Sequence, residues 1–266
     1  MTKNVEKQEP GNVENPVENV EKSAGTRRYE VAKGVFVTVS EVHRFGTDAV
    51  LLADFACPKK SDIACDLGTG CGIIPLLWCR NEYPKSITAV DIQADACELL
   101  KSSAAASGLE GRIVTVCADL REMAVNGGGG KYTLVTMNPP YKPEGTGIKS
   151  ASEGEKLTRH ETACTLDDAS RAAARLLNFA GRFCICHRPE RLCDIITSMR
   201  GAGIEPKRIR FVSQRSELEP WLVLVEGKKG AKPSVRVMPG LIIEDENGKP
   251  SDELEQIYSF YREMRK

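Results

Sequence analysis

The chain has 266 residues, of which 41% are hydrophobic, and its 37 basic and 37 acidic side chains give no formal net charge. This size allows one large domain or two small ones with a sizeable core, and the zero net charge argues against a protein that coats nucleic acid. The longest apolar run, residues 73–79, is far shorter than the roughly 20 residues of a membrane helix, and the N-terminus has no apolar signal core, so we expect a soluble, cytoplasmic protein.

The N-terminal segment differs in composition from the rest of the chain. Residues 1–26 are rich in Pro, Asn and Glu, which is typical of a disordered, acidic tail, and we expect residues 27–266 to form a single domain. Residues 27–40 alternate apolar and polar side chains, which predicts two short strands as an N-terminal extension. Residues 46–56 have the apolar spacing of a helix, with Thr47 or Asp48 placed to cap it.

From residue 61 onward, predicted strands alternate with predicted helices. We expect strands at 62–67, 86–91, 112–117, 132–137 and 182–187 and near 207–213 and 221–226, and helices at about 73–82, 93–108, 166–178 and 189–202. This alternation indicates an α/β fold, with a mostly parallel sheet that helices cover on both faces. The ten cysteines follow no C-x-x-C spacing and mostly lie in apolar stretches, so we expect free thiols and no metal site.

Two long loops and one basic stretch interrupt this pattern. The glycine-rich residues 126–131 are expected to be a flexible connector, and residues 142–164 form a long loop of the kind that often closes over a substrate. Residues 200–236 hold nine basic and four acidic side chains, an excess that could contact phosphates.

A glycine-rich turn, "DLGTGCG" at residues 66–72, follows the first strand of the alternating region. Gly68, Gly70 and Gly72 let the backbone approach a ligand closely at the carboxyl end of a parallel sheet, where ligands collect. Asp66 precedes the glycines, and its carboxylate would repel a pyrophosphate but attract a ligand that carries an ammonium group.

Two further carboxylates follow the next two strands. Asp91 ends its strand 23 residues after Gly68, the position from which a carboxylate accepts hydrogen bonds from both ribose hydroxyls. Asp119 follows the third strand and could accept a hydrogen bond from an adenine amino group. Together with Asp66, these side chains suit a nucleoside with a positively charged amino-acid tail, which is the chemistry of S-adenosylmethionine.

The segment "NPPY" at residues 138–141 ends the fourth strand with two residues that cannot donate a backbone hydrogen bond. An exocyclic amino nitrogen is a poor nucleophile because its lone pair is delocalised into the ring. If the Asn138 side-chain oxygen and the Pro139 carbonyl each accept one N–H, the lone pair is aimed at the methyl donor. Tyr141 can stack on the base, a contact worth about 1–3 kcal/mol.

These segments resemble the class I S-adenosylmethionine-dependent methyltransferases, and "NPPY" is their signature for methylating a nitrogen conjugated to a π system. The stretches "RFGTDAVLLADFA" (44–56), "MNPPYKPEGTGIKS" (137–150), "TRHE" (158–161) and "PGLIIEDENGKPSDE" (239–253) are similar to the bacterial tRNA1(Val) adenine-N6 methyltransferase family. The resemblance implies a Rossmann-like fold with a seven-stranded sheet. It also implies catalytic roles for Asn138, Pro139 and Tyr141, and cofactor contacts from Thr47, Ile92 and Asn138 besides the residues above.

The acceptor is left open by the motif itself, because adenine N6, guanine N2 and a protein glutamine amide can all be held in this way. The family resemblance favours the adenine on the 3′ side of the anticodon in tRNA, a loop base that is cheap to unstack. N5-methylation of a release-factor glutamine and N2-methylation of an rRNA guanine are the alternatives. We expect tRNA as the partner and favour a monomer, although the sequence leaves the oligomeric state open.

Overall fold

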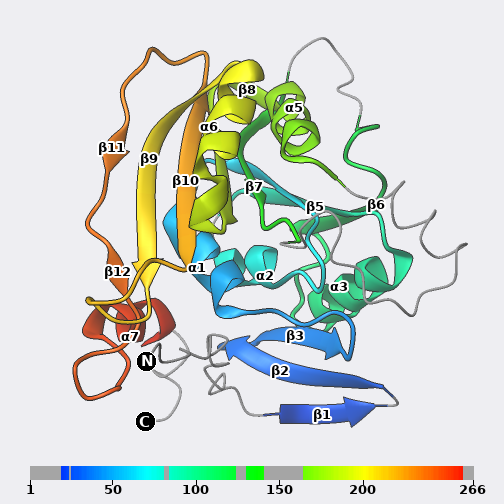
Figure 1. The fold of residues 1–266 in the computed structure, drawn as a ribbon. Helices are drawn as coiled ribbons and strands as arrows, with labels where there is room; N and C mark the ends of the chain where they lie inside the picture. Colours follow the sequence, from blue (N-terminus) through cyan, green and yellow to red (C-terminus); the bar gives the residue numbers. More distant parts are fainter. Residues whose placement is uncertain (1–18, 24, 81–83, 124–129, 141–163, 260–266) are drawn as a thin grey trace, which may run out of the picture.

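The computed structural model describes residues 19–23, 25–80, 84–123, 130–140 and 164–259 (Figure 1). The predicted connector at 126–131 and the predicted loop at 142–164 therefore lie almost entirely outside the described residues. Within these ranges the chain forms one large sheet with helices on both faces and one small N-terminal sheet.

The large sheet is mostly parallel, as predicted. Among the described residues it contains nine strands, in the order β11-β9-β10-β8-β7-β4-β5-β6, with β12 also paired to β9. Only β10 runs antiparallel to its neighbours in this sheet. The strands are β4 (Ile63–Leu67), β5 (Ser86–Asp91), β6 (Ile113–Cys117), β7 (Tyr132–Met137), β8 (Leu177–His187), β9 (Ile204–Ser213), β10 (Leu222–Lys229), β11 (Arg236–Val237) and β12 (Leu241–Ile242).

The expected count of seven strands was therefore too low, because β11 and β12 add two short pieces alongside β9. Each has only two residues, which is too short to show the alternation of side chains on which strand prediction depends. Without them, the order β9-β10-β8-β7-β4-β5-β6 contains each of the seven predicted strands.

Helices cover both faces of the sheet, and each face has its own core. One core includes α1, α2 and α7, and the other includes α5 and α6. The helices are α1 (Thr47–Ala56), α2 (Ile73–Cys79), α3 (Ala94–Ala106), α5 (Leu166–Leu176), the 3-10 turn η1 (Pro189–Arg191), α6 (Leu192–Gly201) and α7 (Asp252–Ser259). The sequence patterns did not predict α7.

A three-stranded antiparallel sheet of β1 (Asn19–Ser23), β2 (Thr26–Ala32) and β3 (Val35–Ser40) lies beside α3 (Figure 1). Two backbone N–H groups of β3, at Phe36 and Thr38, donate at 2.8 Å to the hydroxyls of Ser107, which caps the end of α3, and of Ser103 within α3. The serines thereby satisfy N–H groups that would otherwise form an open strand edge.

The strand β1 corrects the predicted boundary of the N-terminal tail. It lies inside residues 1–26, which we expected to be disordered throughout. The segment has little apolar character, but its backbone pairs with β2 in a register that runs from Asn19 opposite Tyr29 to Ser23 opposite Thr26. Strand pairing can thus order a polar segment that composition alone assigns to a tail.

The junction between α5 and β8 also differs from the prediction. The helix ends at Leu176 and the strand begins at Leu177, five residues before the predicted start at Arg182. Leu177 pairs with Tyr132, and the register then shifts so that Leu134 pairs with Arg182. This irregularity, which includes Ala180 at a φ of 64°, has no regular alternation for a sequence pattern to detect.

Candidate active site

The glycine turn after β4 lies at the carboxyl edge of the sheet, where β4 lies between β5 and β7. Gly68 and Gly70 have φ values of 65° and 56°, in the left-handed region that favours glycine. A Cβ at Gly70 would meet no atom within 4 Å, and one at Gly68 would meet only the Met137 methyl carbon at 3.8 Å. The open side of this turn therefore leaves room for a ligand next to the backbone.

Gly72 serves a different purpose from the other two glycines. It is buried, its N–H donates to the Thr69 carbonyl at 2.9 Å, and a Cβ there would lie 2.2 Å from Leu100 of α3. The absence of a side chain lets the start of α2 pack against α3. Its predicted contact with a cofactor has no support in this geometry, because the residue faces the core.

Asp66 is buried in the sheet just before the turn. Its Oδ1 accepts a hydrogen bond of 2.6 Å from the Thr136 hydroxyl on β7, whereas Oδ2 and the Thr69 hydroxyl have no hydrogen-bond partner among the described residues. Burial raises the pKa of Asp66 to about 7, more than the nearby hydroxyls of Thr136 and Thr69 lower it. These two orphaned polar atoms fit a ligand that brings an ammonium group.

Asp91 ends β5 and supports the turn from the neighbouring strand. Its Oδ2 accepts the Gly70 N–H at 2.8 Å and its Oδ1 accepts the Gln93 N–H at 3.0 Å. Each carboxylate oxygen retains a lone pair for a ribose hydroxyl. The next residue, Ile92, is 46% exposed and offers an apolar surface beside this carboxylate.

Asp119, after β6, has less capacity to bind a ligand than the sequence suggested. Both of its carboxylate oxygens accept hydrogen bonds from the Arg121 side chain, at 2.5 to 3.0 Å, and Oδ1 also accepts the Arg121 backbone N–H at 2.8 Å. The bond from Arg121 holds the pKa of Asp119 below its ordinary value. A contact with an adenine amino group would have to share oxygens that Arg121 already occupies.

The predicted cap of α1 was wrong. Gly46 is the N-cap residue and no side chain caps the helix, while Thr47 and Asp48 lie inside its first turn. Asp48 instead accepts the Ala49 N–H at 2.8 Å through Oδ1. Thr47 lies close to Tyr258 of α7.

Asn138 lies directly after β7 with contacts at both ends of its side-chain amide. Its Nδ2 donates to Asp48 Oδ2 at 3.2 Å, and its Oδ1 accepts from the Cys186 thiol of β8 at 3.1 Å. Pro139 is buried and Pro140 is exposed, whereas Tyr141 lies outside the described residues. The structure therefore gathers Asp66, Asp91 and Asn138 at the ends of three adjacent strands.

Sequence reasoning missed three side chains that shape this site: Asp48, Thr136 and Cys186. The alternation of side chains along β7 offered one signal for Thr136. Thr136 lies on the same face of the sheet as Leu134, and it stands opposite Asp66 in the register with β4. The contacts of Asp48 and Cys186 with Asn138 span 90 and 48 residues along the chain, and no local pattern indicates them.

Ion pairs take up part of the positive charge in the basic stretch 200–236, whose excess we expected to be able to contact phosphates. Four of its five arginines pair with carboxylates of the same chain, with Arg200 and Arg215 remaining exposed, and Lys229 donates to the carbonyls of Ala174 and Leu177. The pairs are Arg200 with Glu205, Arg208 with Glu226, Arg210 with Glu253 and Arg215 with Glu244. Lys228 of β10 stands opposite Glu205 in the strand register, next to the start of β9. It therefore lies at the amino edge of the sheet, the edge opposite to the one that carries Asn138.

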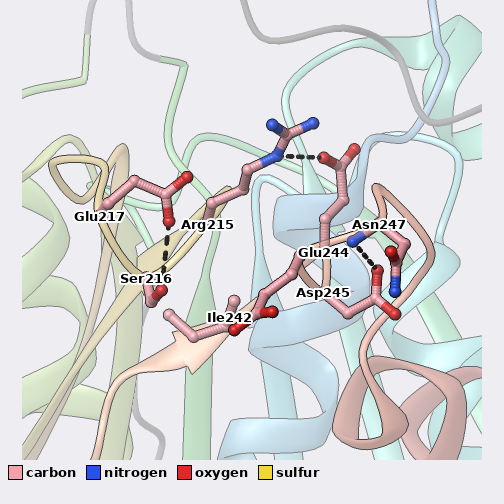
Figure 2. Close-up of a pocket in the computed structure, with 8 residues that line it drawn as sticks. Arg215, Ser216, Glu217, Ile242, Glu244, Asp245 and Asn247 are labelled. Atoms are coloured by element: carbon pink, nitrogen blue, oxygen red, sulfur yellow. Dashed lines mark hydrogen bonds and ion pairs between the residues drawn. The ribbon is translucent and has the colours of Figure 1, made fainter.

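A separate pocket of about 490 Å³ lies where β9 and β12 end (Figure 2). Arg215 donates to Glu244 at 3.1 Å across it, and Asp245 accepts the Asn247 N–H at 2.8 Å. The other lining residues are Ser216, Glu217, Ile242 and Glu246. The strands β8 and β10 separate this acidic pocket from β7, so it is distinct from the site at Asn138.

The strand order, with one reversed strand next to β9, and the glycine turn at the carboxyl edge define the fold of class I methyltransferases. Solved structures share this fold. A predicted O-methyltransferase from Agrobacterium tumefaciens is 19% identical, with a TM-score of 0.62 over 80% of this chain and 96% of that one. A tRNA m1G37 methyltransferase from M. jannaschii is 17% identical, with a TM-score of 0.51 over 78% of this chain and 55% of that one.

The chain belongs to the methyltransferase small domain family, whose model matches residues 17–154. It is also similar to two proteins named tRNA1(Val) (adenine(37)-N6)-methyltransferase. The one from Parabacteroides distasonis is 29% identical over 69% of this chain and 76% of that protein. The one from Phocaeicola vulgatus is 28% identical over 70% of this chain and 76% of that protein. In the part of the chain that the structure describes, no helix has the length and apolar character to span a bilayer.

Proposed function

We propose that this methyltransferase uses S-adenosylmethionine to methylate N6 of an adenine in tRNA, at the position on the 3′ side of the anticodon. The observation that carries the proposal is the Asn138 amide, held at the carboxyl edge of the sheet with its nitrogen toward Asp48 and its oxygen pointing away from that carboxylate. The names of the relatives from Parabacteroides distasonis and Phocaeicola vulgatus support adenine as the acceptor and position 37 as the site.

The residues at the ends of β4 and β5 suit the cofactor. Asp66 Oδ2 and the Thr69 hydroxyl would accept hydrogen bonds from its ammonium group, and the open side of Gly68 and Gly70 admits its amino-acid tail. Asp91 would accept from the ribose hydroxyls, and the exposed side chain of Ile92 would pack on the adenine ring. When bound, S-adenosylmethionine supplies an electrophilic methyl group on a sulfonium centre.

The protein's contribution to the reaction is orientation of the target amine. Asn138 Oδ1 and the Pro139 carbonyl each accept one N–H of the exocyclic amine, which holds its lone pair out of conjugation with the ring. Methyl transfer to this nitrogen would break the carbon–sulfur bond of the cofactor, and the nitrogen would then release one proton to solvent. No side chain is required as a dedicated base, because the methylated amine is strongly acidic before it loses that proton.

The proposal is tested by incubating the purified protein and S-adenosylmethionine with tRNA from a strain that lacks the gene. Mass spectrometry of the digested nucleosides should detect N6-methyladenosine, and an adenine-to-guanine change beside the anticodon should abolish it. Parallel reactions with ribosomal RNA and a release factor test the two alternatives. N2-methylguanosine or a methylated glutamine in place of N6-methyladenosine would overturn the proposal.

A further inference from the structure

Asp48 is the residue whose contact with Asn138 no sequence pattern indicated. It is the second residue of α1, and its two carboxylate oxygens have separate partners: Oδ1 accepts the Ala49 N–H at 2.8 Å, and Oδ2 accepts from Asn138 Nδ2 at 3.2 Å. The backbone contact fixes the rotation of the carboxylate, so that Oδ2 faces the end of β7.

The carboxylate of Asp48 occupies space that is free only because residue 46 is glycine. A Cβ at Gly46 would lie 2.8 Å from Asp48 Oδ1, closer than a carbon and an oxygen can approach. The glycine before the helix therefore allows Asp48 to fold back over the helix start. The same rotamer brings its other oxygen to Asn138.

The orientation of an asparagine amide matters for the proposed reaction because its oxygen and nitrogen are nearly identical in size. Rotation by a half-turn exchanges an acceptor for a donor. Only one orientation of Asn138 presents an acceptor to the target amine, and the other would place two N–H donors against each other. A neighbouring group that can accept a hydrogen bond but cannot donate one disfavours the wrong orientation, because it would face the amide oxygen without a hydrogen between them.

We propose that Asp48 is a positioning residue that holds the Asn138 amide with its oxygen toward the target amine. An ionised carboxylate has no proton to donate, so a flipped amide would place its oxygen against Asp48 Oδ2. The Cys186 thiol, a donor, lies 3.1 Å from the opposite end of the amide and favours the same orientation. This inference rests on the proposed function, because it assigns the acceptor that the reaction needs.

The first test replaces the carboxylate by an amide of the same shape. In Asp48→Asn, the oxygen that still accepts the Ala49 N–H leaves an NH2 group toward Asn138, so the flipped amide is satisfied and the wild-type orientation is no longer selected. We expect the single-turnover rate on tRNA to fall at least about tenfold, with the Kd for S-adenosylhomocysteine within about threefold of wild type. Asp167→Asn is the matched control, because Asp167 is likewise a carboxylate in the second position of a helix, α5, where it pairs with Arg171.

The second test uses a variant in which orientation no longer matters. Asn138→Asp places an acceptor at both ends of the side chain but sets its charge against Asp48. Adding Asp48→Asn supplies a donor and removes this repulsion. We expect the double variant to methylate tRNA at least about fivefold faster than Asn138→Asp, although Asp48→Asn alone slows the reaction.

A third measurement needs no activity. The side-chain NH2 signals of Asn138, assigned in [15N]asparagine-labelled protein by their loss in Asn138→Asp, should exchange slowly with solvent in the wild type. They should exchange at least about tenfold faster in Asp48→Asn but not in Asp167→Asn.

The outcomes separate the two proposals. A wild-type protein that does not methylate tRNA contradicts the proposed function, while the exchange measurement still tests Asp48. If the wild type is active, a rate for Asp48→Asn within twofold of the Asp167→Asn rate would overturn the inference. A double variant slower than both single variants would overturn it as well, because independent roles predict such additive losses.

Discussion

At the scale of single residues, two carboxylates of the site are prepared for different tasks by their surroundings. Asp66 is buried, with one oxygen bound to Thr136 and the other without a partner in the described part of the chain. Asp48 is partly exposed at a helix start, and both of its oxygens are bound. The first is suited to receive a cation, and the second to hold a neighbour in place.

The raised pKa of Asp66 predicts that cofactor binding depends on pH. Burial raises this pKa to about 7, so below pH 7 the free protein carries a protonated Asp66 that cannot pair with an ammonium group. Binding of S-adenosylmethionine should then weaken up to about tenfold for each pH unit below 7 and release a proton. Calorimetry at pH 6, 7 and 8 in buffers of different ionisation enthalpy measures both effects.

Asp66→Asn provides the control for this prediction. It should bind more weakly at pH 8 and lose the pH dependence between pH 6 and 8. A carboxyl group whose pKa is raised in the folded state lowers the stability of the fold as pH rises from the pKa of the unfolded chain to the folded pKa of about 7. Asp66→Asn removes this loss, so the variant should have a Tm about 2 °C or more above that of the wild type at pH 8. A pH-independent wild-type Kd would contradict the assignment of Asp66.

At the scale of secondary structure, α1 is anchored at both ends by residues far away in sequence. Asp48 binds Asn138 at its start, and at its end Arg182 donates to the Ala56 carbonyl at 2.8 Å and Arg208 donates to the Phe55 carbonyl at 3.0 Å. Glu226 of β10 accepts hydrogen bonds from both arginines, at 3.1 and 2.7 Å. The helix that presents Asp48 is thus fixed to β8, β9 and β10.

Glu226→Gln should therefore weaken the fold. It leaves the partly buried Arg182 and Arg208 without their shared carboxylate, and we expect a loss of about 2–3 kcal/mol in the free energy of unfolding, below the 3–5 kcal/mol of a fully buried pair because Asp62 still contacts Arg182. Urea unfolding at pH 7 measures this loss.

The pH dependence of that difference provides a second check. Burial alone would raise the pKa of Glu226, but the hydrogen bonds and charges of Arg208 and Arg182 outweigh burial and hold the pKa below its ordinary value. A depressed pKa means that the stabilisation is present above the ordinary pKa and is lost as pH falls through the folded value. The difference in the free energy of unfolding between wild type and Glu226→Gln should therefore become smaller in acid. A difference that does not change with pH would contradict an ionic origin of this stabilisation.

The glycine turn allows a paired test at the same scale. Gly72→Ala places a Cβ 2.2 Å from Leu100 at a φ of 80°, so we expect a loss of about 2–4 kcal/mol of stability from overpacking and backbone strain. Gly70→Ala meets nothing within 4 Å, so it should cost only about 1–2 kcal/mol but weaken cofactor binding. Urea unfolding and calorimetry on both variants separate the packing glycine from the ligand-facing one, and an equal loss of affinity in both would contradict this division.

At the scale of the whole molecule, the two edges of the sheet have different roles. The carboxyl edge carries the glycine turn, Asp91 and Asn138, whereas Lys228 lies at the amino edge, where β10 ends beside the start of β9. Two exposed arginines flank the site at the carboxyl edge: Arg44 precedes α1, and Arg188 follows β8 two residues after Cys186. Phosphates of a bound RNA would meet these arginines and not the amino-edge lysines.

This division predicts a contrast in the salt dependence of RNA binding. Arg44→Ala with Arg188→Ala should lower the slope of log Kd against log salt by about 1–2, because each lost phosphate contact removes roughly 0.7–0.9. Lys228→Ala with Lys232→Ala, where Lys232 is an exposed residue three positions after the end of β10, removes the same charge from the opposite edge and should leave the slope unchanged. Binding of tRNA at 50 to 200 mM salt measures both, and the reverse result would place the RNA at the amino edge.

Much of the fold was predictable from the sequence, because its signals are local. The strands at 86–91 and 132–137 were predicted to the residue, and the paired strands on either side of Lys33 and Gly34 were confirmed. Side-chain alternation fixes such strands, and apolar spacing fixes the helices between them. Very short strands, the polar strand β1 and the irregular start of β8 were not predictable, because they have no period to detect.

For the site, the sequence by itself determined which residue types stand at the ends of the strands: the glycines, Asp66, Asp91 and Asn138. Only the tertiary structure decided which partners they have. It separated the buried Gly72 from Gly68 and Gly70, which have open space beside them, paired Asp119 with Arg121, and brought Asp48 to Asn138 across 90 residues. The physical reason is that local patterns set the face on which a side chain lies, whereas its partner depends on how helices and strands pack, and packing joins residues without regard to their separation in sequence.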